Sequence, residues 1–286
     1  MEINYLILAH SNLQQVDLMI NTLMMPNTYF HIHIDKKVSL KEIQSHSFYT
    51  NKNVILLKRR KSLNWGGFSL VEATLNLMES GIKKSRSGGY FVLLSGKDFP
   101  IQSNHKIHSF LADNYGSEFI KCDPLPFKNW NNGGLERIQY YWLGDILPTE
   151  ISRNFYQFQI EKNLPRPFFE DFHPFGGSQW WCLTSDCILY ILKFIRFNPI
   201  LLDFFKFSFI PDELFFQTVI MNSPFCEKVV NDNLKYIIFN KHQSHPKIFR
   251  AEDFESLIES NKLWARKFDI TEDVTIVNRL MEVIKE

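Results

Sequence analysis

The sequence lacks several features that would place it in common protein classes. Its first apolar run, residues 3–9, is much shorter than the roughly 20 residues of a membrane-spanning helix, and Glu2 precedes it where a signal peptide would be basic. Lys and Arg number 32 and Asp and Glu 31, so the net charge is only +1. The longest basic cluster, residues 58–61, is short enough for a surface loop. We therefore expect a cytoplasmic protein that does not bind nucleic acid.

Metal-binding, disulfide and common nucleotide-binding motifs are also missing. The four cysteines show no C-x-x-C spacing and no paired histidines accompany them, so neither a zinc site nor a disulfide framework is predicted. We expect them to be reduced thiols in the core: Cys122, Cys182, Cys187 and Cys226. No G-x-G-x-x-G follows the first predicted strand and no G-x-x-x-x-G-K-[ST] occurs, which disfavours a dinucleotide-binding fold and a P-loop NTPase.

The apolar pattern predicts an α/β fold with a largely parallel sheet. Short apolar runs predict strands at residues 3–9, 29–34, 54–57 and 90–94, and apolar residues at helical spacing predict helices at 12–25 and 68–78. The second half is less regular, with predicted strands at 137–142, 179–183 and 234–239 and a helix at 187–194. No Pro/Gly/Ser-rich linker divides the 286 residues, so one domain is expected. Its nucleotide-binding half spans about residues 1–120, and its acceptor-binding and catalytic half spans 121–286.

Polar residues follow three of the predicted strands. They are Ala9-His10-Ser11, Asp35-Lys36 and Ser95-Gly96-Lys97-Asp98. In parallel sheets, ligands bind at the carboxyl ends of the strands. We therefore expect these three segments to share a site.

Two charged clusters in the second half are candidates for a catalytic base and for a phosphate-binding site. Asp212 and Glu213 follow Pro211 at the start of an apolar helical run, where one carboxylate could act as a general base; alternatively, both could cap the helix. Arg266 and Lys267 lie between aromatic residues, as a site for anionic phosphates requires; alternatively, they are a solvated basic pair.

Aromatic residues are dense, and two segments rich in them have two interpretations each. Gly176-Gly177-Ser178-Gln179-Trp180-Trp181 could bring the backbone and the tryptophan faces close to a sugar, or it could be a tight turn into a core strand. The Phe-rich segment 201–210 could contact a membrane surface, or it could pack in the core.

Seven segments in order along the chain resemble one family, the core-2/I-branching β-1,6-N-acetylglucosaminyltransferases and peptide O-xylosyltransferases (glycosyltransferase family 14). They are YLILAH (5–10), HIDKK (33–37), WGGFSLVEA (65–73), LSGKDFPI (94–101), GGSQW (176–180), PDE (211–213) and ARKF (265–268). The resemblance implies a GT-A type glycosyltransferase fold with a mostly parallel central sheet flanked by helices.

The resemblance also implies a reaction. A sugar, xylose or N-acetylglucosamine, would move with inversion from a UDP-sugar to an acceptor hydroxyl on a glycan or glycoconjugate. No metal or other cofactor would be needed. Metal-dependent enzymes of this fold carry a D-x-D motif, which this sequence lacks; the nearest variant, residues 253–255, lies in a predicted helix. The Arg-Lys pair resembles the xylosyltransferase branch.

By resemblance, individual residues take roles in this reaction. Glu213 is the general base, while Arg266 and Lys267 bind the diphosphate. Asp35 corresponds to an aspartate that accepts the uracil N–H, although it could instead cap a loop. Ala9 and His10 border the nucleotide. One phosphate-binding arginine of the core-2 branch falls at Ser244 here, so that contact is missing. The expected sugar pocket comprises Asp98, Trp65, Gly66, Gly177, Ser178, Trp180 and Asp212.

The animal enzymes of this family have a membrane anchor, a stem and stapling cysteines that are not evident here. We therefore expect a bacterial-type enzyme that acts on a lipid-linked or surface-glycan precursor, with peripheral contact at the inner face of the membrane. Two alternatives stay open. A non-catalytic carbohydrate-binding protein would use Trp65, Trp180 and Trp181, and a glycoside hydrolase would use two carboxylates on either side of a glycosidic bond.

Overall fold

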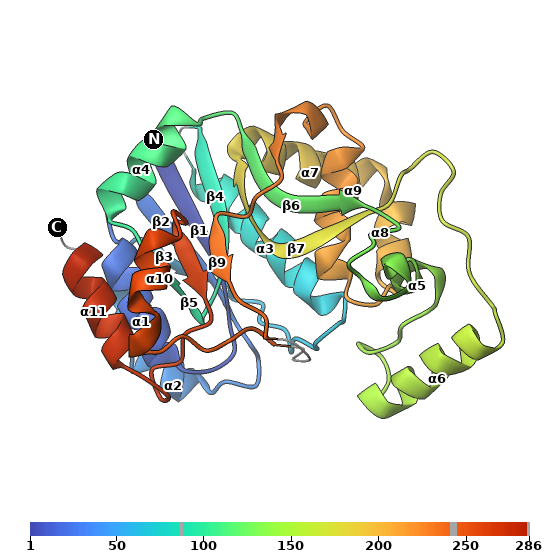
Figure 1. The fold of residues 1–286 in the computed structure, drawn as a ribbon, viewed down its shortest axis with the longest axis horizontal. Helices are drawn as coiled ribbons and strands as arrows, with labels where there is room; N and C mark the ends of the chain where they lie inside the picture. The colour runs from blue at the N-terminus through green and yellow to red at the C-terminus, as the bar shows by residue number, and fades with distance from the viewer. Residues whose placement is uncertain (86–87, 241–244, 285–286) are drawn as a thin grey trace.

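The computed structural model describes residues 1–85, 88–240 and 245–284. Its main sheet has seven strands in the order β3-β2-β1-β4-β7-β6-β8 (Figure 1). β3, β2, β1 and β4 are mutually parallel, β7 is antiparallel to both β4 and β6, and β8 is parallel to β6. The bounds are β1 Glu2–Ala9, β2 Thr28–Ile34, β3 Val54–Leu56, β4 Gly89–Ser95, β6 Glu118–Pro124, β7 Phe175–Thr184 and β8 Val229–Val230. The predicted α/β fold with a mostly parallel central sheet is confirmed.

A second, three-stranded sheet joins distant parts of the chain. Its order is β5 (Asp98–Pro100), β10 (Trp264–Arg266) and β9 (Lys235–Ile237). β10 runs antiparallel to β5, in a register that pairs Arg266 with Asp98, and parallel to β9. This sheet therefore carries Arg266 to the end of β4.

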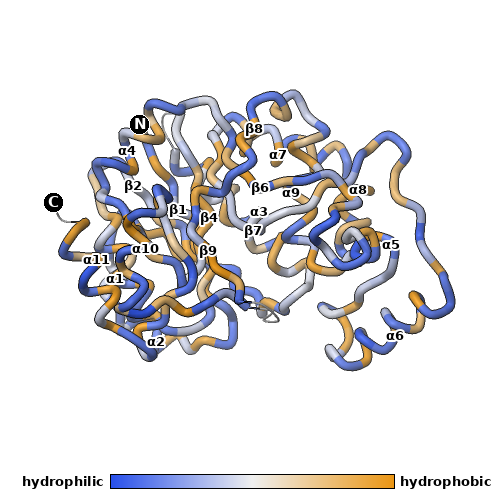
Figure 2. Tube along the Cα trace, viewed as in Figure 1, coloured by the Kyte–Doolittle hydropathy of each residue, from blue (hydrophilic) through white to orange (hydrophobic). Residues whose placement is uncertain are grey.

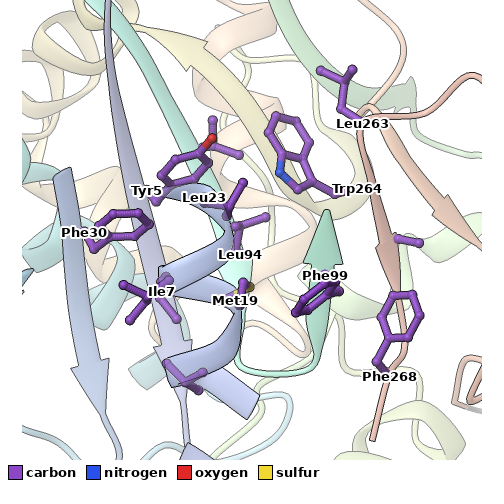
Figure 3. Packing of buried hydrophobic residues seen from close by; sticks show 14 of the residues in the cluster. Tyr5, Ile7, Met19, Leu23, Phe30, Leu94, Phe99, Leu263, Trp264 and Phe268 are labelled. Atoms are coloured by element: carbon purple, nitrogen blue, oxygen red, sulfur yellow. The ribbon is translucent and has the colours of Figure 1, made fainter. Parts of the chain in front are cut away.

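Helices cover both faces of the main sheet because alternate residues of its strands point to opposite sides. Ile3, Tyr5 and Ile7 belong to one core with α1 (Leu13–Leu23), α4 (Asn104–Asp113), α10 (Phe254–Glu259) and α11 (Thr275–Ile284). Figure 3 shows Trp264, Phe99 and Phe268 of the second-sheet region packing into this core. Leu6 and Leu8 belong to the opposite core with α3 (Ser69–Lys84), α7 (Ser185–Phe197), α8 (Pro199–Phe205) and α9 (Phe215–Met221).

The remaining elements are short or lie at the edge. α2 is Leu40–Gln44, α5 is Glu136–Gln139 and α6 is Thr149–Glu161; 3₁₀ turns occupy Ser47–Thr50, Asn131–Gly134, Pro211–Glu213, Cys226–Lys228 and Ala251–Asp253. α6 stands off the body at the lower right of Figure 1 and contacts it through Ser152, Tyr156 and Gln159. Figure 2 shows hydrophobic and hydrophilic residues alternating along it. Ile151, Phe155 and Phe158 are exposed.

Most predicted elements are found within a few residues of their expected bounds, but the predicted strand at 137–142 is wrong. The segment forms α5 and then an irregular stretch. Its alternating apolar residues are buried, Ile138 in the core beside the main sheet and Tyr140 and Trp142 in a separate cluster with Tyr156. Side chains, rather than a neighbouring strand, satisfy much of its backbone: the Gln159 amide bonds both the N–H and the carbonyl of Tyr141.

The Phe-rich segment 201–210 packs in the core, which confirms the core-packing interpretation of its sequence. Leu201 and Phe205 are buried, and Phe204 lies 5.3 Å from each of the rings of Phe168 and Phe169. Across the described ranges, no helix combines the length and apolar character that crossing a bilayer requires.

The cysteines are free, as predicted. Cys122, Cys182 and Cys187 are buried, whereas Cys226 is half-buried and so is not a core residue.

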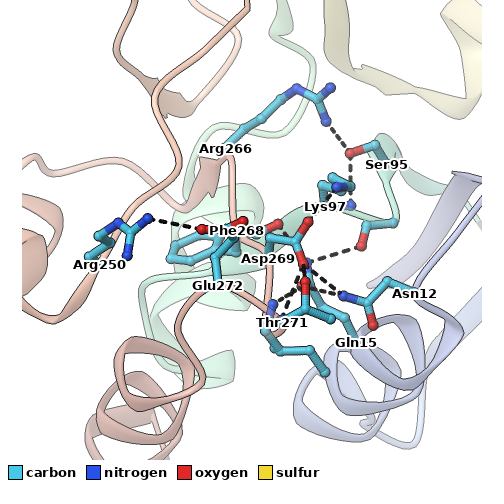
Figure 4. A network of polar contacts seen from close by, with 12 residues as sticks. Asn12, Gln15, Ser95, Lys97, Arg250, Arg266, Phe268, Asp269, Thr271 and Glu272 are labelled. Carbon is cyan, nitrogen blue, oxygen red and sulfur yellow. Dashed lines mark hydrogen bonds and ion pairs between the residues drawn. The ribbon is translucent and has the colours of Figure 1, made fainter.

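Gln15, buried on α1, ties three segments together. Its amide donates to the carbonyls of Gly96 and Phe268 at 3.1 and 3.2 Å, and its oxygen accepts from the N–H of Ile270 at 3.0 Å. Figure 4 shows this contact beside Asp269, which also receives a hydrogen bond from Asn12. The helix after β1 therefore anchors the loop after β4 and the segment after β10.

We expect Gln15→Ala to lower the free energy of unfolding by about 2–4 kcal/mol, because it leaves three backbone groups without their partner. Urea denaturation measures this. Gln14→Ala, at the exposed neighbouring position of the same helix, is the matched control and should change stability by less than about 0.5 kcal/mol. Equal effects of the two substitutions would contradict the anchoring role.

Candidate active site

The carboxyl ends of β1, β2 and β4 meet, as expected. The N–H of Asp35 bonds the carbonyl of Ala9 at 2.8 Å, and the N–H of Gly96 bonds the carbonyl of Leu8 at 3.0 Å. His10 is exposed at this edge. Partial desolvation and then the charges of Lys97, Arg266 and Lys267 lower the pKa of His10, while Asp35 opposes them. The structure thus brings the three predicted strand ends and the Arg-Lys pair to one place.

Three cations gather there. The Arg266 guanidinium donates to Ser95 Oγ and lies 3.2 Å from Asp98, and Lys97 Nζ lies 2.6 Å from Asp269 (Figure 4). Lys267 is half-buried, and its ammonium has no ion pair or hydrogen bond within the described residues. Desolvation and then the charges of Lys97 and Arg266 lower the pKa of Lys267. Because the positive charges repel one another, an anion bound among them would be stabilised.

Asp98 lies on the buried side of this cluster of cations. It is fully buried and accepts hydrogen bonds from Lys235 Nζ at 2.6 Å, from the Ser95 N–H at 2.8 Å and from Ser95 Oγ at 3.0 Å. Burial raises the pKa of Asp98, but Lys235 and Arg266 outweigh burial and lower it. Burial lowers the pKa of Lys235 to about 8 against the pull of Asp98. Asp98 orients Arg266 in this structure, and its predicted contact with a sugar stays a prediction.

Trp180 is buried behind the same cations. Lys235 Nζ lies 4.0 Å from its ring centroid and Arg266 Cζ lies 4.8 Å from it, within the range of cation–π attraction. Trp181 is fully buried against Phe216. The two tryptophans therefore support the site from behind, which does not fit stacking of a sugar on their faces.

The glycines beside these tryptophans permit close strand packing. The whole segment belongs to β7, and a Cβ at Gly177 would overlap the carbonyl of Lys121 on β6. The carbonyl of Ser178 accepts from Gln217 at 2.7 Å, and its Oγ accepts from Asn233 at 2.9 Å. Ser178 thus connects β7 to α9, which follows Glu213.

Asp212 and Glu213 have different surroundings within one 3₁₀ turn. The Glu213 side chain is 34% exposed, and its Oε2 accepts from Arg137 at 2.7 Å. Asp212 is 5% exposed and its Oδ1 has no partner within the described residues. Burial and then the charge of Glu213 raise the pKa of Asp212 to about 7. Neither carboxylate caps α9, so the capping alternative is wrong.

Arg137 was not singled out by any sequence motif. It lies on α5, and its guanidinium stacks 3.8 Å from the ring centroid of Trp130 while it holds Glu213. Only the fold brings α5 to this turn, because Phe209 donates its N–H to the carbonyl of Arg137 at 2.8 Å. Arg137 therefore fixes one carboxylate oxygen, and the other, which has no partner in the described part of the chain, can approach a ligand.

The loop before α3 lies beside the same turn. The Ile210 N–H bonds the carbonyl of Gly66 at 3.0 Å, and Gly66 has a φ of +72°, which suits glycine. Trp65 is 68% exposed and touches Phe209 edge-on at 5.7 Å. An exposed tryptophan face thus lies next to the segment that carries Glu213.

Asp35 acts as a loop cap in this structure. Its two oxygens accept the N–H groups of Lys37 and Leu63, each at 2.8 Å, and the residue is buried. The loop-cap alternative is confirmed, and uracil binding stays a prediction. Ser244 lies outside the described residues. Over the described ranges, no group of three or more His, Cys, Asp or Glu side chains is arranged to hold a metal.

Comparisons with known proteins give a consistent result. The model of a family described as Core-2/I-Branching enzyme matches residues 3–258. Xylosyltransferase 2 of Canis lupus familiaris is 25% identical over 301 residues, covering 94% of this chain and 32% of that protein. Xylosyltransferase oxt of Drosophila melanogaster is 25% identical over 296 residues, with the same two coverages. The chain thus spans about a third of the length of these curated relatives.

Among solved structures, the crystal structure of S. aureus TarS 1–349 overlaps with a TM-score of 0.31 and 8% identity. The overlap covers 42% of this chain and 35% of that one. This likeness is too partial to carry an argument.

We expect Asp212 to make a contribution to stability that falls as the pH rises from 5 to 8. The folded state keeps a proton on this carboxyl up to about pH 7, whereas the unfolded chain loses it near pH 3.8, so folding is favoured at low pH and this advantage disappears through pH 7. Asp212→Asn removes the effect. Relative to the wild type, its stability in urea should rise by roughly 2 kcal/mol between pH 5 and pH 8.

The matched control for this pH effect is Asp203→Asn at an exposed carboxylate, which should leave the pH dependence unchanged. If Asp212→Asn follows the wild type at every pH, Asp212 is ionised throughout and its raised pKa is wrong.

Proposed function

The chain belongs to the Core-2/I-branching enzyme family of glycosyltransferases, and on that premise we propose that it moves a sugar from a UDP-sugar to a hydroxyl of a glycan or glycoconjugate acceptor. Its α/β fold is of the GT-A type. The observation that supports this proposal best is the cluster of Lys97, Arg266 and Lys267 at the strand ends, with the Lys267 ammonium unpaired among the described residues. Such a cluster suits a diphosphate.

The cations would stabilise the leaving group. Departure of UDP builds negative charge on the β-phosphate, so fixed positive charges there lower the free energy of the transition state more than that of the ground state. Arg266 is already oriented by Asp98 and Lys267 is open to an anion. Three protein cations would supply the charge that a metal bound at a D-x-D motif supplies elsewhere in this fold, so we propose a metal-independent reaction.

Glu213 would be the base. An inverting transfer is a single displacement, in which the acceptor hydroxyl loses its proton as it attacks the anomeric carbon. Arg137 holds Oε2 of Glu213, which leaves Oε1 for that proton. Trp65, exposed beside this turn, offers a face on which a sugar ring can stack.

The uridine would bind at the ends of β1 and β2. Each Asp35 oxygen accepts one backbone N–H, and a carboxylate oxygen can accept a second bond, such as one from the uracil N–H. Ala9 and His10 border this position. We propose xylose or N-acetylglucosamine as the sugar and the cytoplasm, with peripheral contact at the inner face of the membrane, as the setting.

The two alternative functions have less support. A glycoside hydrolase needs carboxylates on opposite sides of the bond that it cleaves. Here Asp212 and Glu213 share one turn and Asp212 is buried. A non-catalytic sugar-binding protein would need neither Glu213 nor the three cations, and the buried Trp180 and Trp181 offer it no stacking faces.

We expect Glu213→Gln to lower turnover at least a hundredfold while UDP affinity changes less than twofold, because the amide cannot take the acceptor proton. Turnover is measured as UDP release from UDP-xylose and UDP-N-acetylglucosamine with a panel of glycan acceptors, and affinity by calorimetry. Glu150→Gln, on the distant α6, is the control and should behave as the wild type. Turnover of Glu213→Gln within about threefold of the wild type would reject Glu213 as the base.

In EDTA, saturating UDP should raise the melting temperature of the wild type, since a ligand at a hundred times its Kd stabilises a fold by about 2.7 kcal/mol. Lys267→Ala should weaken UDP binding at least tenfold because it removes a charge-assisted contact to phosphate. Lys193→Ala, exposed on α7, serves as the matched control. A wild-type response that requires Mn²⁺ would disprove metal-free phosphate binding, and no response in either condition would reject the UDP-sugar donor.

A further inference from the structure

A cavity of about 580 Å³ opens beside α5, within the size range of small-molecule sites. Its walls are mostly apolar. They include Leu135, Ile138, Phe168, Phe169, Phe172 and three prolines of the segment 165–174. An apolar cavity of this size on the surface of a protein suits a hydrocarbon ligand.

One charged side chain lines this cavity. Arg166 is 8% exposed and forms no ion pair within the described residues; its guanidinium carbon lies 3.8 Å from the ring centroid of Phe204 and 4.8 Å from that of Tyr141. Its Nε donates to the carbonyl of Ile138 at 2.9 Å, Nη1 to that of Phe204 at 3.0 Å, and Nη2 to that of Phe207 at 3.2 Å and to Ser208 Oγ at 2.8 Å. Four of the five guanidinium N–H groups are thus used by neutral oxygens.

This arrangement leaves the positive charge without a carboxylate counter-ion within the described residues, and only the ring faces of Phe204 and Tyr141 offset it. Burial of a charge without a counter-ion is costly, and here burial lowers the pKa of Arg166 to about 10. The neutral partners fix the guanidinium in place, and one N–H on Nη1 has no partner within the described residues. An anion that enters the cavity would gain a charge-assisted hydrogen bond in an apolar setting, where such bonds are strong.

The cavity shares its structural elements with the candidate catalytic turn. α5 contributes Leu135, Ile138 and Gln139 to the cavity, and Arg137 of the same helix holds Glu213. Arg166 also bonds Ser208, five residues before Glu213. In Figure 1, α5 and α8 lie together on the right of the molecule. A ligand in the cavity is therefore next to the elements that position Glu213.

We propose that this cavity binds the non-sugar part of the acceptor, an amphiphile in which a phosphate or carboxylate is joined to a hydrocarbon chain. This assignment rests on the proposed glycosyltransferase function and names its acceptor class. The apolar walls take the chain, Arg166 takes the anionic group, and the acceptor hydroxyl reaches Glu213.

The test uses octyl phosphate below its critical micelle concentration, with 1-octanol and inorganic phosphate as its two separate parts. Binding is measured by calorimetry with UDP present, so that the cations at the strand ends are occupied. We expect octyl phosphate to bind at least tenfold more tightly than either part. If 1-octanol binds as tightly as octyl phosphate, Arg166 does not recognise the anionic group. If inorganic phosphate binds as tightly as octyl phosphate, the hydrocarbon chain contributes nothing and the ligand is not an amphiphile.

Gln139→Glu changes the charge of the cavity wall while its shape stays nearly the same. Gln139 lines the cavity, so a carboxylate there should pair with Arg166 and repel the ligand, which we expect to weaken octyl phosphate binding at least tenfold. Gln157→Glu makes the same change at an exposed position of α6 and should have no effect. Leu135→Trp, which fills the cavity without changing charge, should also abolish binding. Wild-type binding by both cavity variants would overturn the proposal.

The response to UDP in EDTA, measured on the same samples, distinguishes the two proposals. It also shows that each variant is folded. If the wild type does not bind octyl phosphate but keeps its UDP response, the cavity is rejected as an acceptor site and the glycosyltransferase proposal stands. If UDP does not raise the melting temperature of the wild type, the glycosyltransferase proposal is rejected. The acceptor role of the cavity, which rests on that proposal, is then rejected as well.

Discussion

The buried ion pair between Asp98 and Lys235 is the interaction on which the candidate site depends. Both side chains are almost completely excluded from water, and their atoms lie 2.6 Å apart. Because removal of one partner from such a pair leaves an unpaired buried charge, the two residues constrain each other strongly. Asp98 begins β5 and Lys235 begins β9, so the pair also fixes the two outer strands of the small sheet around β10. Arg266 at the end of β10 is oriented as a consequence.

The two neighbouring carboxylates show how environment assigns different properties to similar side chains. Glu213 is partly exposed and bonded to a cation, whereas Asp212 is buried with an oxygen that has no partner in the described ranges. A carboxyl group is stable in the first setting when ionised and in the second when protonated. The same turn therefore holds one carboxylate that is paired with Arg137 and one buried carboxyl group whose pKa is raised.

Much of the fold could be predicted from the sequence, because β1, β2, β4, α1 and α3 carry strong and regular apolar patterns. The convergence of the three strand ends followed from the general geometry of parallel sheets. The residues that support the site could not be found this way. Lys235 and Arg137 belong to no local pattern, and their roles arise from contacts across 137 and 76 residues. The predicted strand at 137–142 was wrong for the same reason. Its apolar residues alternate because they are buried against other loops, and not because the segment pairs with a strand.

The small sheet places the end of the chain beside its beginning, and this has a consequence for biosynthesis. Asn12 bonds Asp269, 257 residues later, next to the cations at the strand ends. At typical translation rates, the ribosome needs roughly 10 to 50 s to synthesise the intervening residues. During that interval β1, β2 and β4 can pair, but their carboxyl ends lack Arg266 and Lys267. The nascent chain therefore lacks Arg266 and Lys267, two of the three cations of the candidate site, until the C-terminal segment emerges and docks, so a truncated translation product would not acquire the complete candidate site.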